Sequence, residues 1–587
     1  MSISRREFVR LMGLAGAAGL LPRSAFSQRK VPSDFYEIPA FGNARILHFT
    51  DCHAQLLPIY FREPSVNLGF GNAYGKAPHL VGKHLLDRFE FTEDGIEAHA
   101  FTYLNFEDSA KLYGKVGGFA HLATLVKKMR AEYGQGRSLL LDGGDTWQGS
   151  GTSYWTRGRD MVGACNLLGV ELMTGHWEFT YQDKEVLDNA AAFNGEFISQ
   201  NCKVKEDSQF DYELADIGDF NEDTGHVFKP YVIRQLGDLR FAVIGQSFPY
   251  TPIANPQRFM PDWTFGINED DMQEMVDRVR DVEKPDSVIL LSHNGMDVDL
   301  KMASRVRGID AIFGGHTHDG VPGAISIDNS GGITLVTNAG SNGKFLGVMD
   351  FDIKGKKVRN YHYRLLPVFS NLLEADSEMQ SYIDTVRKPY MNQLNEKLAI
   401  ADGTLYRRGN FNGTFDQIIC DALRAVGNAQ ISLSPGFRWG TTVLSHQDIT
   451  MEHVLDQTSI TYPETYVRDM SGEDLKLILE DVADNLFNPD PYYQQGGDMV
   501  RLGGLDYVID PLGKVGERIS SMQLDNGVAI EASKKYKVAG WATVGSQSLG
   551  APIWDVVAEY LRSQKVAMLS KINTPKLKNI SGNPGYA

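Results

Sequence analysis

Residues 45–53 read RILHFTDCH, a short apolar run that is followed at once by Asp51 and His53. Such a run predicts a buried β-strand that ends in a polar loop. Residues two apart in an extended chain point the same way, so we expect Asp51 and His53 to share a metal ion while Cys52 turns away. An Asp-x-His triplet is common by chance, so this stretch decides the fold only together with its counterparts further along the chain.

Four further apolar runs end in the same manner. They are Ser138–Leu141, Val170–Met173, Ser287–Leu291 and Ile309–Phe313, and the polar side chains that follow them are Asp145, His176, His293, His316 and His318. Any one of these alone is more often a turn or a structural histidine. In α/β proteins, however, ligand sites form in the loops at strand ends, because the strands hold those loops rigid. The order D-x-H, D, H, H, H-x-H therefore predicts a single site.

The seven side chains offer only imidazole nitrogens and carboxylate oxygens. With Asp145 shared, they fill two sites of four protein ligands each and leave room for water, as two-metal hydrolysis requires. A donor set without thiolate suits manganese, iron or zinc, and it does not choose among them. We predict a two-metal hydrolase.

The strands belong to a longer alternation of apolar and amphipathic stretches from about residue 44 to 366, which is typical of an α/β domain. We place this first domain at residues 40–370. Apolar residues at helical spacing predict one connecting helix over residues 374–398. A second domain is expected at residues 400–575, with helices over 415–426 and 475–486 and glycine-rich turns at 496–497 and 503–504.

Composition limits the classes of partner. The formal net charge of the 587-residue chain is -16, so a nucleic-acid backbone or an anionic membrane surface would be repelled as the main partner. The four cysteines, Cys52, Cys165, Cys202 and Cys420, lie far apart without a C-x-x-C spacing. A structural zinc site is therefore not expected. We predict no particular disulfide and expect most of these residues to be buried free thiols.

The N-terminus carries Ser4-Arg5-Arg6-Glu7-Phe8 before an apolar run from Leu11 to Leu21. Residues 1–27 resemble a twin-arginine export signal, which predicts a periplasmic protein. The alternatives are a basic start to a helix or a membrane anchor. Because the apolar run is too short to span a bilayer, we expect no stable membrane association.

The motif set resembles the 5'-nucleotidase branch of the calcineurin-like metallophosphoesterases over most of the chain after residue 27. The resemblance implies a four-layer αββα metallophosphoesterase domain followed by a smaller α+β substrate-binding domain. It also divides the metal ligands into two groups, which are Asp51, His53, Asp145 and His318 at one ion, and Asp145, His176, His293 and His316 at the other. Residues 434–438, SPGFR, stand where these enzymes carry an N-G-G-I-R-like segment. This implies that Arg438 binds the substrate anion and acts with Asp145 in catalysis.

One motif departs from the nucleotidase pattern. Nucleotidases usually read G-N-H-E-F-D-Y, whereas residues 175–181 read GHWEFTY. The metal-binding Asn becomes His176, the catalytic His becomes Trp177, and the Asp partner of that His becomes Thr180. Because the dyad helps an alkoxide to depart, a phosphomonoesterase that lacks both members would be slowed by about 10²- to 10⁴-fold. A thiolate or persulfide is a much weaker base and can depart without an acid.

The G-H-W-E variant, the export signal and a long insertion from about Pro58 to Lys115 together resemble the SoxB family, the thiosulfohydrolases of the bacterial Sox system. This resemblance implies two manganese ions and, as substrate, a sulfonate on a cysteine of the C-terminal arm of the SoxYZ carrier, which is released as sulfate. Arg408 is either a second contact to the anion or a solvated charge. Trp177 either walls a channel for the carrier arm or fills the space that the missing His leaves. His79 and His84, in the insertion, are expected to be surface or packing residues.

Two other functions fit the sequence. The same fold can act on phosphate esters, as a periplasmic 5'-nucleotidase or a 2',3'-cyclic-nucleotide phosphodiesterase. A metal site can also organise the surface of a noncatalytic binding module. A filled ligand set favours an enzyme over the binding module.

Overall fold

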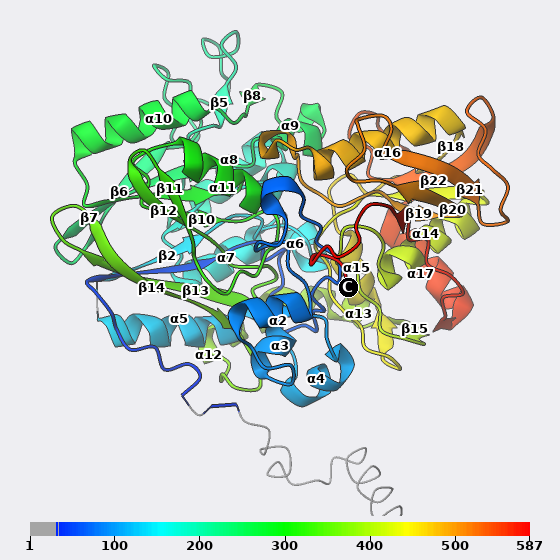
Figure 1. Cartoon of the computed structure of the whole chain (residues 1–587), viewed down its shortest axis with the longest axis horizontal. Helices are drawn as coiled ribbons and strands as arrows, with labels where there is room; N and C mark the ends of the chain where they lie inside the picture. The colour runs from blue at the N-terminus through cyan, green and yellow to red at the C-terminus, as the bar shows by residue number, and fades with distance from the viewer. Residues whose placement is uncertain (1–30, 33, 135) are drawn as a thin grey trace, which may run out of the picture.

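The structure, a computed structural model, describes residues 31–32, 34–134 and 136–587. The expected export signal at residues 1–27 lies outside the described residues. Two six-stranded sheets form the N-terminal half, drawn in blue to green (Figure 1). The first sheet has the order β14 (Val358–Pro367), β13 (Phe345–Ile353), β1 (Ala44–Phe49), β2 (Ser138–Asp142), β3 (Leu172–Met173) and β4 (Glu196–Phe197). The second has the order β11 (Ile325–Asn329), β12 (Gly332–Asn338), β10 (Ala311–Gly314), β9 (Ser287–Ser292), β7 (Leu239–Gln246) and β6 (Tyr231–Leu236).

The two sheets bury apolar side chains against each other and against helices on their outer faces. Ile46 of β1 and Leu139 of β2 are register partners and belong to the cluster between the sheets. Their neighbours Leu47 and Leu140 point the opposite way and belong to the cluster that includes α5 (Phe119–Tyr133), as the period of two along a strand requires. The second sheet is covered on its outer face by α10 (Glu269–Arg278) and α11 (Met296–Arg305). The predicted four-layer αββα arrangement is therefore confirmed.

The strands predicted from apolar runs are present, although β10 begins two residues later than the predicted run Ile309–Phe313 and β3 is shorter than its predicted run. The run Val170–Met173 yields only the two-residue strand β3, Leu172–Met173. The central strands β1, β2, β3 and β4 are parallel to one another, as are β7, β9, β10 and β12. Parallel strands present their carboxyl ends at one edge of a sheet, so the loops that follow them converge there.

The connection between the halves is helical but is not one helix over residues 374–398. It consists of α12 (Ser377–Arg387), a 3-10 turn (Lys388–Tyr390) and α13 (Met391–Leu394), and the next strand begins at Lys397. Asp376 caps α12 by accepting a hydrogen bond from the backbone N–H of Met379 at 3.1 Å. The interruption falls at Pro389, which lacks the N–H that a continuing α-helix needs.

The C-terminal half, drawn in yellow to red, builds three small sheets and four main helices (Figure 1). The sheets are β17 (Asp448–Thr450), β15 (Lys397–Ala401) and β23 (Val566–Ala567); β18 (Thr465–Ser471), β22 (Lys535–Trp541), β16 (Ile431–Ser434) and β19 (Arg501–Gly503); and β21 (Ile519–Leu524), β20 (Leu505–Ile509) and β24 (Lys576–Leu577). The helices are α14 (Thr414–Gly427), α15 (Met451–Thr458), α16 (Gly472–Phe487) and α17 (Ile553–Gln564). Both helices predicted here are present as α14 and α16.

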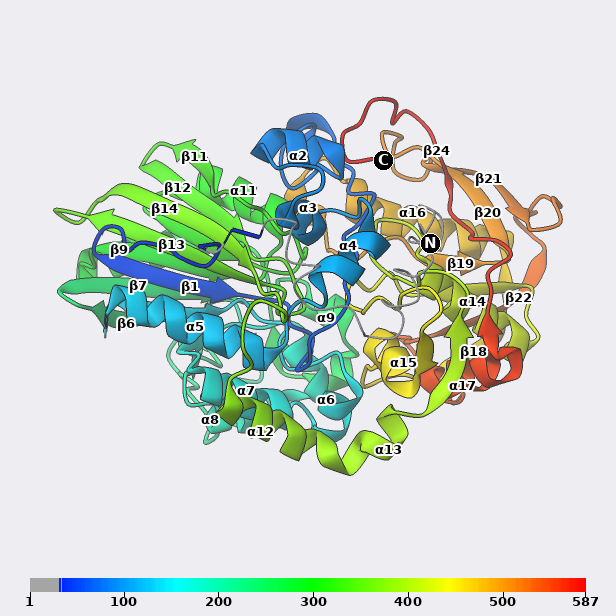
Figure 2. The ribbon, with the colours of Figure 1, turned by 90° about the horizontal axis from the view of Figure 1, so that it is seen from below.

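The insertion from Pro58 to Lys115 carries α2 (Lys83–Phe89), α3 (Ile96–Phe101) and α4 (Phe106–Tyr113), which lie between the two halves (Figure 2). It is hydrogen-bonded to the C-terminal half, since the backbone N–H of Leu68 donates to Oδ1 of Asn410 at 2.9 Å. The C-terminal tail returns to the insertion, where the N–H of Asn67 donates to the carbonyl of Gly585 at 2.7 Å. The insertion therefore ties the two halves together.

The described residues contain no helix that is long and apolar enough to cross a membrane. Cys52, Cys165, Cys202 and Cys420 are all buried and free, as expected from their spacing.

Candidate metal centre

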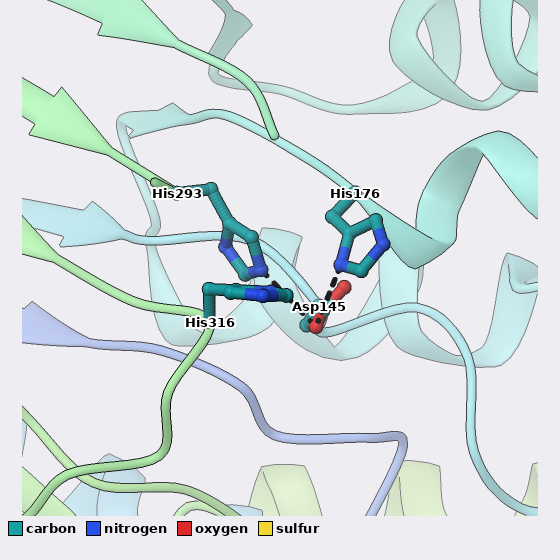
Figure 3. A group of neighbouring side chains, drawn as sticks. All are labelled: Asp145, His176, His293 and His316. Atoms are coloured by element: carbon teal, nitrogen blue, oxygen red, sulfur yellow. Dashed lines mark ion pairs between the residues drawn. The ribbon is translucent and has the colours of Figure 1, made fainter. Parts of the chain in front are cut away.

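The seven side chains that the sequence singled out lie in two buried groups at the carboxyl ends of the parallel strands. In each group the potential ligand atoms lie within 4.8 Å of one another, and the groups are Asp51, His53, Asp145 and His318, and Asp145, His176, His293 and His316. Figure 3 shows the second group, with its three imidazole rings gathered around the Asp145 carboxylate. These groups are the two that the family resemblance implies.

Asp145 is common to both groups. Its Oδ2 lies 3.1 Å from Nε2 of His293, 3.4 Å from Nδ1 of His176 and 3.7 Å from Nε2 of His53. One carboxylate oxygen thus faces nitrogens of both groups, which is the placement that a bridging ligand between two cations requires.

The loops that carry these residues adopt an unusual backbone. Asp51, His53, Asp145, His316 and His318 all have positive φ, between 45° and 75°. The expectation that Asp51 and His53 align because the chain is extended is therefore wrong in its reasoning. They meet because the loop turns through left-handed positions, held by hydrogen bonds from the N–H of Asp51 to the carbonyl of Gly144 and from the N–H of His53 to the carbonyl of Asp145, both 2.8 Å. Such backbone strain is concentrated at functional sites.

Gly144 shows why a glycine precedes Asp145. It has φ +94°, and an added Cβ would lie 2.8 Å from the carbonyl oxygen of Thr174. Only glycine fits this close approach between the loops after β2 and β3.

Several imidazole nitrogens of the two groups fit a metal centre because no group among the described residues bonds to them. Among the described residues, both ring nitrogens of His176 and of His316 and Nε2 of His293 are buried without a hydrogen-bond partner. Nε2 of His53 lies 3.0 Å from Nε2 of His318. The residues present could therefore hold two metal ions.

The hydrogen bond of His293 fixes which of its nitrogens is available. Nδ1 lies 2.6 Å from the carbonyl of Gly143 and donates to it, so Nε2 faces Asp145. This carbonyl contact is the usual support of a metal-binding histidine. Burial alone would lower the pKa of His293, but Asp145 and Asp51 raise it to about 10. A bound cation would displace that proton.

The other histidines of the two groups stay neutral. Burial is the largest effect on each of them, and it lowers the pKa of His53 to about 4 and the pKa values of His316 and His318 well below their usual range. Burial would raise the pKa of Asp145, but His293 and His176 hold it well below its ordinary value. Neutral imidazoles around an ionised carboxylate are the forms that bind divalent metal.

Glu178 is a supporting residue that the sequence analysis missed. Its buried carboxylate accepts backbone N–H bonds from Thr146 at 2.7 Å, His176 at 2.9 Å, and Asp145 and Trp147 at 3.1 Å each. It thereby joins the loops that carry Asp145 and His176. Its place in the G-H-W-E motif is the signal that could have identified it.

A cavity of about 390 Å³ opens onto the centre from the C-terminal half. Asp145, His176, His316 and His318 contribute to its lining, together with several aromatic rings, among them Trp177, Phe437, Trp439 and Trp541. The ring of Trp177 makes edge contacts to Phe437 and Trp439, at centroid distances of 5.4 and 5.1 Å. Trp177 thus both lines the cavity and packs against its neighbours.

The two predicted arginines contact the H-x-H loop, but only one reaches this cavity. Arg438 lines it and donates to the carbonyls of Gly497 at 2.8 Å and His316 at 3.4 Å. Arg408 does not line it. Its Nη2 donates to the carbonyls of Thr317 at 3.0 Å and His318 at 3.4 Å. Arg408 is buried rather than a solvated charge.

The insertion contributes polar residues near the arginines, His79 among them. His79 is buried, and its Nε2 lies 2.8 Å from Oδ2 of Asp297. His84 is exposed, as expected. The partner of His79 lies 218 residues away in sequence, so no local pattern could have revealed the pair.

Two family models match the chain in the order of its two halves. Residues 44–320 match the calcineurin-like phosphoesterase family, and residues 393–554 match the 5'-nucleotidase C-terminal domain family. Among curated proteins, the chain is 26% identical over 478 residues to a trifunctional nucleotide phosphoesterase of Bacillus subtilis, which covers 74% of this chain and 31% of that protein. It is also 26% identical to the 5'-nucleotidase of Bos taurus, over 56% of this chain and 58% of the relative. The chain thus spans between about a third and somewhat over half of these curated relatives.

Two solved structures match over nearly their whole length. The sulfate thiohydrolase SoxB of Thermus thermophilus, solved with glycerol, is 34% identical with a TM-score of 0.85, covering 93% of this chain and 98% of that one. A 5'-nucleotidase precursor from the same organism superposes with a TM-score of 0.70 at 20% identity, covering 91% of this chain and 99% of that one, and shows the shared fold. From these matches and the site, the chain belongs to the 5'-nucleotidase family of calcineurin-like metallophosphoesterases and is a metal-dependent hydrolase.

Proposed function

We propose that this protein hydrolyses a sulfonate bound to a cysteine sulfur, and that its substrate is the sulfonated C-terminal arm of a SoxYZ-type carrier protein. The observation that carries the proposal is the lack of a proton donor for the leaving group among the described residues of the cavity. Trp177 occupies the position of the family's catalytic histidine, and Thr180, in place of the partner aspartate, bonds instead to Oγ1 of Thr461 at 2.6 Å.

The other acidic groups at the cavity do not replace the dyad. Tyr250 and Tyr462 donate their hydroxyl groups to the carbonyls of Tyr492 and Ala254. Burial raises the pKa values of Tyr250, Tyr462 and Tyr466 above that of a free tyrosine, so each is a poor acid near neutral pH. Asp498 is ionised and held by Arg438 and Arg501. An alkoxide would therefore leave without help, whereas a thiolate needs none.

The reaction balances without a redox partner. Water adds to the sulfonate sulfur, the bond from that sulfur to the carrier sulfur breaks, and the electron pair leaves with the carrier as thiolate or persulfide. The products are sulfate, the free carrier sulfur and two protons. When bound, two divalent ions supply Lewis acidity and activate water.

The protein residues bind and orient the substrate in this scheme. Arg438 lines the cavity beside His316, where its guanidinium can bind the anionic oxygens. Several aromatic side chains line the cavity, and polarizable sulfur packs favourably against aromatic rings. The 34% identity to the sulfate thiohydrolase of Thermus thermophilus over nearly the full length of both chains supports the same assignment. Manganese as the metal and twin-arginine export to the periplasm are part of the proposal.

The sequence relatives favour one other function. They include nucleotide phosphoesterases and 5'-nucleotidases, which act on phosphate esters on the same fold. Incubation of the purified protein with S-sulfonated SoxYZ carrier and, separately, with AMP, with and without Mn²⁺, separates the two functions. We expect manganese-dependent sulfate release that exceeds phosphate release. Phosphate release from AMP without sulfate release from the carrier would overturn the proposal and favour a nucleotidase.

A further inference from the structure

A second, smaller cavity of about 60 Å³ adjoins the metal centre and shares His316 and Arg438 with the larger cavity as lining residues. Its other walls include Arg408, His79, Asp297 and Asp319, and Phe487 is the one aromatic ring besides the histidines among its described lining residues. This volume is sufficient for a few water molecules or one small ion.

Arg408 has bonding capacity left inside this cavity. Its guanidinium is buried, with 8% of the residue exposed, and only Nη2 is bonded, to the carbonyls of Thr317 and His318. Its Nε has no partner among the described residues. Because an unpaired buried donor on a charged group is costly, a ligand that accepts from Arg408 would be stabilised there.

His79 adds a second polar side chain to the wall of this cavity, and its Nδ1 is buried without a hydrogen-bond partner among the described residues. His79 pairs with Asp297 at 2.8 Å. Burial alone would lower its pKa, but Asp297 and its hydrogen bond hold the pKa above the ordinary value. The second carboxylate at the cavity, Asp319, accepts from the side chain of Asn67 at 3.1 Å. The cavity wall thus carries two arginines and His79, and its two carboxylates already have partners in the protein.

We propose that this side cavity is a second oxyanion site, which holds the small tetrahedral anion released by hydrolysis, with Arg408 and His79 as its donors and Arg438 at the boundary with the metal centre. That the anion is sulfate rests on the proposed function, whereas the site would take phosphate by the same chemistry. A carrier arm in the larger cavity would block the exit of the product anion through that cavity. The side cavity would then receive the anion while the arm is still in place.

Crystals of the metal-loaded protein, soaked in selenate, test this site directly. Selenate has the shape and charge of sulfate and is located by its anomalous scattering. We expect a selenate in the side cavity within hydrogen-bond distance of Arg408 and His79, in addition to any at the metal centre. Arg408→Met and His79→Gln should each raise the selenate concentration for half occupancy of the side cavity by about tenfold or more, as expected for a lost charge-assisted hydrogen bond.

Arg305→Met, which removes an exposed arginine paired with Glu269, is the matched control and should leave the occupancy unchanged. Because Arg408 also supports the H-x-H loop, metal content and melting temperature are measured for each variant. His79→Gln decides the question if Arg408→Met loses metal. An empty side cavity at selenate concentrations that fill the metal centre would overturn the inference. Occupancy equal to that of the wild type in both variants would also overturn the inference, because the selenate would then be an adventitious ion only. Neither result bears on which ester the enzyme hydrolyses.

Discussion

The backbone N–H of Trp177 donates a 2.7 Å hydrogen bond to Oδ1 of Asp145, the carboxylate shared by the two metal-binding groups. This leaves Oδ2 free to face the histidines of both groups. The backbone at position 177 therefore positions the bridging carboxylate whatever side chain it carries. The side chain at this position is therefore free to differ, and here it is a tryptophan that lines the cavity.

The double variant Trp177→His, Thr180→Asp should restore a proton donor to the cavity. We expect the ratio of phosphate release from AMP to sulfate release from the sulfonated carrier to rise by about tenfold or more, since an acid-base group contributes about 10²- to 10⁴-fold. Trp177→Phe, which keeps an aromatic ring but adds no acid, is the control and should not raise the ratio. An unchanged ratio in a folded, metal-loaded double variant counts against the leaving-group explanation.

Asp145→Asn should remove the bridge between the two metals. The amide is neutral and a weaker ligand, so we expect metal content measured by elemental analysis to fall well below that of the wild type and hydrolysis to drop by at least about 10³-fold. Asp469→Asn, on the exposed part of β18, is the matched control. Retention of full metal content by Asp145→Asn would show that Asp145 is not a ligand.

Glu178→Gln should loosen the loops that carry Asp145 and His176. An amide offers one acceptor oxygen in place of two and turns an NH₂ group toward backbone donors that now bond to Glu178. We expect the free energy of unfolding to fall by about 2 to 4 kcal/mol, with weaker metal binding. Chemical denaturation with and without Mn²⁺ measures both effects, and Glu473→Gln on the exposed face of α16 serves as the control. Wild-type stability and metal affinity in Glu178→Gln would exclude the supporting role.

The His79–Asp297 pair should make stability depend on pH in two windows. The folded-state pKa of His79 is raised above 6.5, so its contribution is complete below pH 6.5 and is lost as the pH rises through the folded value. The pKa of Asp297 is lowered below 3.8, so its contribution is present above that pH and is lost on acidification. We expect melting temperature to decline above about pH 6.5, and the decline to be shallower in His79→Gln. Identical slopes in the two proteins would contradict this.

The sequence predicted the sheet framework because β1, β9 and β10 are buried throughout and β2 is buried except at Ser138, and a continuous apolar run is the direct signature of such strands. It predicted which histidines and aspartates would meet because parallel strands end at one edge. The extended backbone predicted for Asp51 and His53 was wrong. Left-handed φ values at non-glycine residues depend on tertiary contacts, such as the hydrogen bond from the N–H of His53 to the carbonyl of Asp145.

Long-range polar contacts could not be predicted from the sequence for a different reason. The sequence around Arg408 does not show whether its guanidinium binds the substrate or donates to the carbonyls of the H-x-H loop, because an arginine suits either role. The break of the connecting helix near Pro389 was visible in the sequence, because a proline inside a helical pattern is itself a boundary signal.

The central claim is that one carboxylate, Asp145, joins two metal ions held by two sets of side chains. Anomalous diffraction from crystals of the manganese-loaded protein, collected on both sides of the manganese absorption edge, tests it most directly. The account predicts two manganese peaks per chain, both within coordination distance of Asp145, one shared with His53 and His318 and the other with His176 and His293. A single peak, or two peaks of which only one contacts Asp145, would contradict it.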